Sequence, residues 1–373
     1  MANTTSAYSS ASAFLTMVQN HYSDFTVSQP IESKPVDIVT AQEKGIQLPR
    51  SIDFIHNDMF VKIYFPEEVS NRVIYLLGCY NNDSHCSRRV FDEIVLLSNG
   101  EPVETISSHM MDVYYDCYTH NKTIYEEFYR SPFREVDCNN KVYQCLMFPI
   151  RFFFDQVARL KMSKDKDDTN TLTRTVKFYP CESFISNNKD ILQGLQISLC
   201  FCGDIYRNRG VVPFNDYALC DKSDTIGLTS AFNFQTPHKQ IMQYYIDVPK
   251  GFVCRQLWFS VKSIKTHEYI TSDVVDRINI VMGMTPITNM SIKEATVVTQ
   301  TMNGLIPSKN HILANFGEQN TPHSKNVPNS ETHNVGIIYH DVQVVFMFHP
   351  ECDLSDLQVL GFMRIFPLKN IGG

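Results

Sequence analysis

The sequence predicts an all-β protein built from two domains of similar size. The chain has 373 residues, a length that suits about two domains and a large buried core. It contains 25 Phe and 18 Tyr but a single Trp, and aromatic side chains favour pleated, half-buried strands over helices. Short runs of strand-like residues occur in both halves of the chain, with few helical patterns between them. Two β-domains in succession account for these observations most simply.

Residues 1–45 are expected to form an N-terminal arm that carries a short amphipathic helix. The opening ANTTSAYSSASAF is small and polar, whereas Phe14, Met17, Val18 and Tyr22 then fall on one helical face. So short a helix is marginal alone in water, and we therefore expect it to dock on its own domain or on a neighbouring subunit.

The clearest local pattern is EIVLLSNGEPVETISSHMMDVYYDCY, which begins at Glu93. An apolar strand runs into Asn99 and Gly100, a pair that tolerates positive φ and suits a two-residue hairpin turn. Two serines, which are good helix N-caps, then precede bulky residues at helical spacing: Met110, Met111, Tyr114 and Tyr118. A hairpin followed by a helix could form the substrate shelf of an enzyme or cover the open end of a β-barrel.

Further strand candidates stand on both sides of a turn-rich stretch from Gly203 to Gly227, the expected domain boundary. Before it lie VYQCLMFPIRFFF, TRTVKFYP and LQGLQISLCFC; after it lie IMQYYIDV, VCRQLWFSVKSI, INIVMGM, IIYHDVQVVFMF and LQVLGFMRIF. The polar tract SKNHILANFGEQNTPHSKNVPNSETHN, residues 308–334, is too long for a hairpin turn and predicts an elaborated surface loop. Long loops on a rigid scaffold commonly carry recognition surfaces.

Composition limits the classes of function. The net charge is −7 and there is no long basic run, so direct binding to nucleic acid is not expected. The eleven cysteines form no C-x-x-C pair, and Cys200 and Cys202 fall on the less apolar side of a strand. We therefore expect no metal site at these cysteines, and we expect the protein to reside in a reducing compartment. A secretory signal and a long apolar stretch are both missing, which predicts a soluble protein that is not exported by that route.

Sequence motifs of enzymes are absent. There is no G-x-S-x-G elbow, no H-E-x-x-H and no Gly-rich phosphate loop. His311, His323 and His333 lie in the polar tract and His340 interrupts an apolar strand, and their spacing fits no recurrent zinc pattern. They are interpreted as loop histidines and one barrel histidine.

Four carboxylates flank the hairpin and could supply an acid/base pair for sugar hydrolysis: Asp92, Glu93, Glu101 and Glu104. Carboxylates beside a hairpin more often face solvent. We therefore expect solvated or intersubunit charges there, and we expect no catalytic residue, no cofactor and no metal.

Three segments resemble, in their order along the chain, the signatures of one known family. LPRSIDFIHNDMFVKIYFPEE is similar to an entry strand in which a proline-arginine pair and an aspartate precede alternating residues and a final proline, here Pro49, Arg50, Asp53 and Pro66. The hairpin and helix are similar to the next signature, although Asn99 stands before Gly100 where the family often has a second glycine. VLGFMRIFPLKNI, which contains Arg364, looks like the closing strand. The family is the double jelly-roll major capsid proteins of double-stranded DNA viruses.

The resemblance implies two consecutive eight-stranded jelly rolls with a few short helices. The first would span residues 46–206 and the second residues 228–373, with a linker at 207–227 and the arm at 1–45. The hairpin and helix would cap and brace a barrel. Three chains would form a pseudo-hexagonal capsomer of an icosahedral shell, in contact with neighbouring capsomers and minor capsid proteins, and an internal membrane beneath the shell is compatible with this arrangement. The protein would reside in the virion after assembly in the host cytoplasm or nucleus.

Two alternatives remain open from the sequence. A non-virion assembly scaffold could share the same fold. A two-jelly-roll protein that processes or binds carbohydrate would explain the aromatic content and the acidic hairpin, but such proteins are usually secreted.

Overall fold

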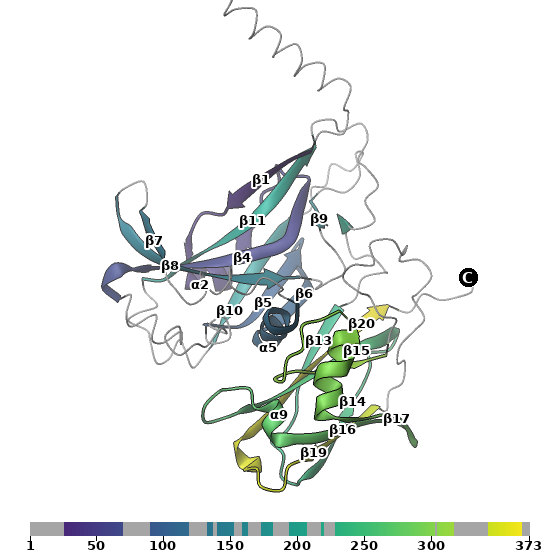
Figure 1. Cartoon of the computed structure of the whole chain (residues 1–373). Helices are drawn as coiled ribbons and strands as arrows, with labels where there is room; N and C mark the ends of the chain where they lie inside the picture. The colour runs from purple at the N-terminus through teal and green to yellow at the C-terminus, as the bar shows by residue number, and fades with distance from the viewer. Residues whose placement is uncertain are drawn as a thin grey trace, which may run out of the picture.

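The computed structural model contains mainly β-strands, arranged as two barrels (Figure 1). It describes residues 26–69, 90–118, 133–136, 140–152, 159–162, 173–181, 194–206, 218–219, 228–302, 304–316 and 342–367. Helical segments are short: α2 (Ile38–Glu43), η1 (Glu67–Val69), α5 (Ser108–Val113), η3 (Tyr114–Tyr118), α9 (Thr271–Val274), η4 (Glu294–Val298), α10 (Thr299–Met302) and η5 (Leu354–Asp356). The predicted all-β class is confirmed.

The described residues of the first barrel form twelve strands. They are β1 (Thr26–Glu32), β2 (Val36–Asp37), β3 (Ile46–Gln47), β4 (Phe54–Pro66), β5 (Phe91–Ser98), β6 (Glu101–Ser107), β7 (Phe133–Val136), β8 (Val142–Arg151), β9 (Arg159–Lys161), β10 (Arg174–Pro180), β11 (Gln196–Tyr206) and β12 (Ala218–Leu219). One sheet has the order β1-β11-β4-β8-β7, with β2, β9 and β12 at its margins, and the other has the order β3-β10-β5-β6.

In the part of the second barrel that the structure describes, eight strands form two sheets of four. They are β13 (Leu228–Asn233), β14 (Ile241–Ile246), β15 (Phe252–Ser263), β16 (Val275–Met282), β17 (Thr285–Ser291), β18 (Ile312–Asn315), β19 (Val342–Phe348) and β20 (Leu357–Pro367). The sheet orders are β13-β20-β15-β18 and β14-β19-β16-β17. Taken in chain order, these are strands one, eight, three and six against strands two, seven, four and five, which is the jelly-roll arrangement of eight strands. The first barrel repeats this order through β1-β11-β4-β8 and β3-β10-β5-β6.

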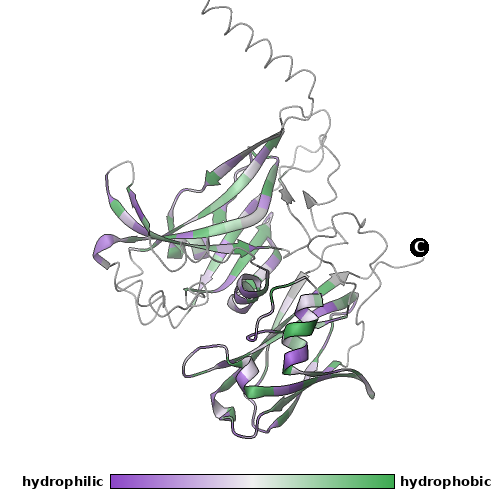
Figure 2. Ribbon diagram, in the orientation of Figure 1, coloured by the Kyte–Doolittle hydropathy of each residue, from purple (hydrophilic) through white to green (hydrophobic). Residues whose placement is uncertain are grey.

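The alternation of buried and partly exposed side chains along the strands shows where the core lies. In β19, Val342, Val344, Phe346 and Phe348 are buried while the residues between them are partly exposed. Figure 2 shows both hydrophobic and hydrophilic residues along the strands of each barrel. A period of two residues puts one set of side chains between the sheets and the other outside, so each barrel has its own apolar core.

The structure corrects the predicted extent of the N-terminal arm. Thr26–Glu32 pairs with β11 in antiparallel register, and Ile38 and Ala41 of α2 are buried in the first core. Residues 26–45 therefore belong to the first barrel, because β1 supplies the neighbour that one edge of β11 needs. The helical face from Phe14 to Tyr22 lies outside the described residues, as does most of the predicted linker.

The polar tract at 308–334 is also corrected in part. Ile312–Asn315 forms β18, which pairs with β15, and His311 is fully buried. Its other two histidines, His323 and His333, lie outside the described residues, and so does His340. Among the described residues, none of the helices is long and apolar enough to span a membrane.

Candidate functional site

The junction between the two barrels begins with the hairpin of β5 and β6. Asn99 has a φ of 52° and Gly100 a φ of 88°, the positive values that a two-residue turn requires. Ser107 then caps α5, since its hydroxyl oxygen accepts a hydrogen bond from the backbone N–H of Met110 at 3.3 Å. The hairpin, its turn and the helix were all predicted from the sequence. α5 lies between the two barrels (Figure 1).

Apolar residues of the second barrel complete the core of the first at this junction. They are Trp258, Leu305, Leu313 and Phe362, all buried in the first barrel's cluster. The Trp258 ring stacks on Phe362 with a centroid distance of 6.2 Å and also lies 6.1 Å from the ring of Tyr118. Withdrawal of one large apolar side chain from water contributes about 1.5–3 kcal/mol, so this contact stabilises the packing of one barrel against the other.

A chain of buried polar groups crosses the same junction. Nε2 of His109, in α5, lies 2.7 Å from the hydroxyl oxygen of Ser260, in β15. That oxygen lies 2.6 Å from Nδ1 of His311, and Nε2 of His311 lies 3.1 Å from a carboxylate oxygen of Asp116. This series of hydrogen bonds therefore begins in the first barrel at His109, passes through Ser260 and His311 of the second barrel, and ends in the first barrel at Asp116.

The donors and acceptors of this chain fit one arrangement of protons. The carboxylate of Asp116 accepts from Nε2–H of His311, and Nδ1 of His311 accepts from the hydroxyl of Ser260. The oxygen of Ser260 then accepts from Nε2–H of His109. This leaves Nδ1 of His109 without a proton, and that atom is buried without a hydrogen-bond partner among the described residues.

Two further hydrogen bonds join the barrels beside the chain. The hydroxyl of Tyr269 donates to a carboxylate oxygen of Asp112 at 2.7 Å. The backbone N–H of Ile306 donates to the carbonyl of Cys117 at 2.9 Å. Polar groups withdrawn from water need such partners, and these bonds fix the orientation of one barrel against the other.

A buried ion pair also joins the two barrels at the junction. Nη1 of Arg364, in β20, lies 3.6 Å from a carboxylate oxygen of Glu104, in β6, and both side chains are buried. The expectation that all four hairpin carboxylates are solvated is therefore wrong for Glu104. Asp92, Glu93 and Glu101 are exposed, as expected.

Two of the motif residues meet at the far end of the first barrel. Nη2 of Arg50 donates to the hydroxyl of Thr173 at 2.7 Å, and the side-chain oxygen of Asn99 accepts from the backbone N–H of Thr173 at 2.9 Å. Asp53 bonds through its backbone, with its N–H donating to the carbonyl of Asp204 at 3.1 Å. These contacts tie the hairpin turn to the loops before β4 and β10.

The two prolines of the motif flank β4. Pro49 is half-buried just after β3, and Pro66 ends β4 opposite Tyr143. Gly100 is exposed at the hairpin turn and Arg364 lies in the junction. The motif residues therefore lie at three separate places: around the two ends of β4, at the hairpin turn and at the junction.

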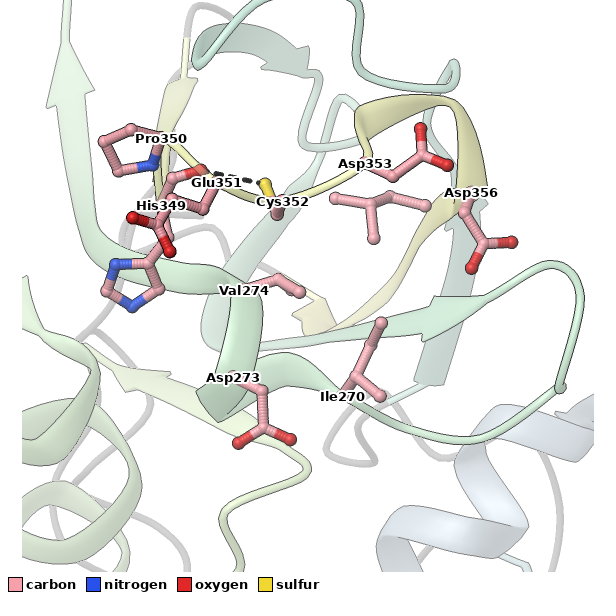
Figure 3. A pocket seen from close by; sticks show the side chains of 10 residues that line it. Ile270, Asp273, Val274, His349, Pro350, Glu351, Cys352, Asp353 and Asp356 are labelled. Carbon is pink, nitrogen blue, oxygen red and sulfur yellow. Dashed lines mark hydrogen bonds between the residues drawn. The ribbon is translucent and has the colours of Figure 1, made fainter.

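A hollow at the end of the second barrel is lined by acidic residues (Figure 3). Asp273 comes from α9, and Glu351, Asp353 and Asp356 come from the connection between β19 and β20. A hydrogen bond from Ser355 holds the pKa of Asp353 below its usual range, and one from Ser263 does the same for Asp356. A general acid requires a raised pKa, so these two carboxylates are poorly suited to that role.

A second hollow lies on the outer face of the first barrel. It is lined by Phe60 and Phe133 around the buried Lys62, whose ammonium group pairs with Glu32 at 3.3 Å and also with Glu135. Burial alone would lower the pKa of Lys62, but the hydrogen bond to Glu135 and the charge of Glu32 outweigh it and raise that pKa. The lysine is held as a charged structural group.

Neither of these two hollows is lined by Glu93, Glu101 or Glu104. Within the described part of the chain, no group of three His, Cys, Asp or Glu side chains could hold a metal ion.

Comparison with solved structures identifies the architecture. The chain matches a chain of the quasi-atomic PBCV-1 virus capsid with a TM-score of 0.58 and 10% identity, over 94% of this chain and 96% of the other. The chain has the double jelly-roll fold. PBCV-1 VP54, fitted into a reconstruction of the virophage Sputnik, shares this fold with a TM-score of 0.58 and 9% identity, over 94% and 96% of the two chains. The Faustovirus major capsid protein also has the double jelly-roll fold, with a TM-score of 0.54 and 8% identity, over 93% and 91%. No family model and no curated protein matches the sequence.

The pairing of His109 with His311 at the double jelly-roll junction was not predicted from the sequence. His109 stands among apolar residues of a predicted helix, and His311 stands directly before ILAN, a short apolar run. A histidine within or beside an apolar run is a signal for burial. The pairing of the two, which lie 202 positions apart, depends on how the barrels pack and has no local signal.

Proposed function

We propose that this chain is a structural protein, a major capsid protein that forms the icosahedral shell of a virus. The observation that carries the proposal is the double jelly-roll fold over nearly the whole chain, which it shares with a chain of the PBCV-1 capsid and with the Faustovirus major capsid protein. The motif residues Pro49, Arg50, Asp53 and Pro66 support the proposal because they lie around β4 of such a barrel.

The assembly proposed is a trimer with a pseudo-hexagonal outline. Each chain supplies two barrels with the same strand order, and the buried junction fixes them as one unit. Three copies around a threefold axis would then place six barrels in a ring, and closed symmetry limits the assembly to that ring. Exposed apolar side chains on the second barrel, Ile241 and Tyr245 of β14 among them, offer surface for contacts between subunits.

The proposed partners are other copies of the chain, neighbouring capsomers and minor capsid proteins, with an internal membrane possible beneath the shell. The proposed location is the virion, after assembly in the host cytoplasm or nucleus. No enzymatic activity is proposed, since Glu93 and Glu101 are exposed and Glu104 is engaged with Arg364.

Electron microscopy tests the proposal. Purified full-length protein, examined in negative stain before and after concentration, should show three-fold particles with a hexagonal outline that form hexagonal sheets or closed shells. Particles without three-fold symmetry, at all concentrations, would contradict it. If the protein is abundant in infected cells but missing from purified virions, it is an assembly scaffold of the same fold instead.

A further inference from the structure

The junction between the barrels contains titratable groups that a purely apolar contact would lack. His109 and His311 share the hydroxyl of Ser260, and their ring centroids lie 5.9 Å apart. Both rings are buried, and each comes from a different barrel. Histidine is the side chain whose ordinary pKa puts its change of charge between pH 5 and 8.

We propose that the hydrogen-bonded series His109–Ser260–His311–Asp116 is a pH-sensitive latch, which holds the two barrels together at neutral pH and releases them when His109 takes up a proton. The latch is a property of the isolated chain and does not depend on the capsid function proposed above.

The geometry explains why the closed latch resists protons. A proton added to His109 must go to Nδ1, the buried atom without a hydrogen-bond partner among the described residues. Nε2 of His109 stays engaged with the oxygen of Ser260, so the added N–H at Nδ1 would face no acceptor among the described residues.

The surroundings of His109 add to this resistance. Asp112 lies on the same helix but is engaged by the hydroxyl of Tyr269, and Asp116 is engaged by His311. The ring of Phe362 lies 5.5 Å away on β20, and Lys262 on β15 contributes positive charge. Burial, followed by the charges of His311 and Lys262, holds the pKa of His109 well below its ordinary value.

The sign of the pH dependence follows from linkage. When the barrels separate, the His109 ring meets water and its pKa returns toward about 6.5. Below that pH the open state binds more protons than the closed state, so acid favours opening, and above it the closed junction keeps its full stability. For one proton taken up, the equilibrium constant for opening should rise by up to about tenfold for each pH unit below about 6.5.

The single tryptophan of the chain is a built-in probe of this opening. Trp258 is fully buried at the junction, on the same strand as Ser260. Full-length protein should be titrated from pH 7.5 to pH 5 while tryptophan emission, acrylamide quenching and far-UV circular dichroism are recorded. We expect a reversible red shift and stronger quenching below about pH 6.5, with an unchanged β-type dichroism spectrum.

Two variants separate the latch from general effects of acid. His109→Gln keeps an amide nitrogen that can donate to Ser260 but cannot titrate, so its emission should stay constant over the range in which the wild type shifts. His238→Gln removes an exposed histidine outside the junction and should behave as the wild type does.

Three results would overturn the proposal. The first is a wild-type emission that does not change while the protein stays folded. The second is a red shift that coincides with loss of the dichroism signal, since that is global unfolding. The third is a His109→Gln profile equal to that of the wild type. If His109→Gln does not fold, hydrogen exchange of the wild type decides: acid must expose residues 108–118 and 304–316 before the barrel strands, after correction for intrinsic rates, and equal loss of protection refutes the latch.

Discussion

At the scale of single residues, Glu104 shows how a local pattern can be overlooked. It was expected to be solvated because it flanks a hairpin turn with other carboxylates. It stands two positions before Ile106 in β6, however, and a strand places such residues on the same face. Ile106 is buried, and Glu104 is buried with it against Arg364. The sequence could therefore have predicted burial, whereas the partner on β20 depends on the packing of the second barrel.

Replacement of Glu104 measures what the ion pair contributes. Glu104→Ala leaves the buried guanidinium of Arg364 without its carboxylate, which costs about 3–5 kcal/mol in the free energy of unfolding. Glu101→Ala, an exposed change in the same strand, should stay within about 0.5 kcal/mol. Urea denaturation followed by circular dichroism gives both values. Equal, small effects would show that the ion pair does not stabilise the junction.

At the scale of elements, segments with strong local signals were predicted and segments that depend on distant partners were not. The hairpin, its turn and α5 carry their own signals, namely positive φ at Asn99 and Gly100 and the cap at Ser107. β1, with the sequence TVSQPIE, is short and contains Pro30, so its strand state comes from pairing with β11, more than 160 positions later. β18 was likewise not predicted, because its residues lie in a polar tract and its strand state comes from pairing with β15.

Two truncations test whether residues 26–45 belong to the barrel. Removal of residues 2–25 leaves β1 and α2 in place, so the protein should keep a cooperative β-type melt. Removal of residues 2–45 exposes one edge of β11 and deletes the buried Ile38 and Ala41, so the melting temperature should fall by several degrees or cooperativity should be lost. Calorimetry compares the two. Equal melting temperatures would mean that residues 26–45 behave as an arm after all.

At the scale of the whole molecule, the fold is one strand order used twice. The eight principal strands of each barrel form the same two four-stranded orders, although the first barrel adds β2, β7, β9 and β12. The sequence contains no visible repeat, so this equivalence lies in the pattern of strands and not in the identity of residues. The two-domain β architecture was predictable from strand-like runs in both halves. The angle at which the barrels meet was not, because it is set by Trp258, the histidine chain and the Glu104–Arg364 pair together.

The proposed trimer depends on two barrels that are fixed relative to each other. If the junction is rigid, contacts between subunits recur with the same geometry and can close into a ring, whereas a loose junction would give mixed oligomers. Multi-angle light scattering at micromolar concentration and neutral pH should give three times the chain mass of 42.9 kDa.

Tyr245→Glu, which puts a charge on an exposed apolar site of β14, should shift the mass toward one chain without change in the dichroism spectrum, if this face carries the contact. Lys239→Glu, at an exposed polar site just before that strand, is the matched control and should leave the trimer intact. A single-chain mass for the wild-type protein across the whole concentration range would contradict the trimer, whatever the variants show.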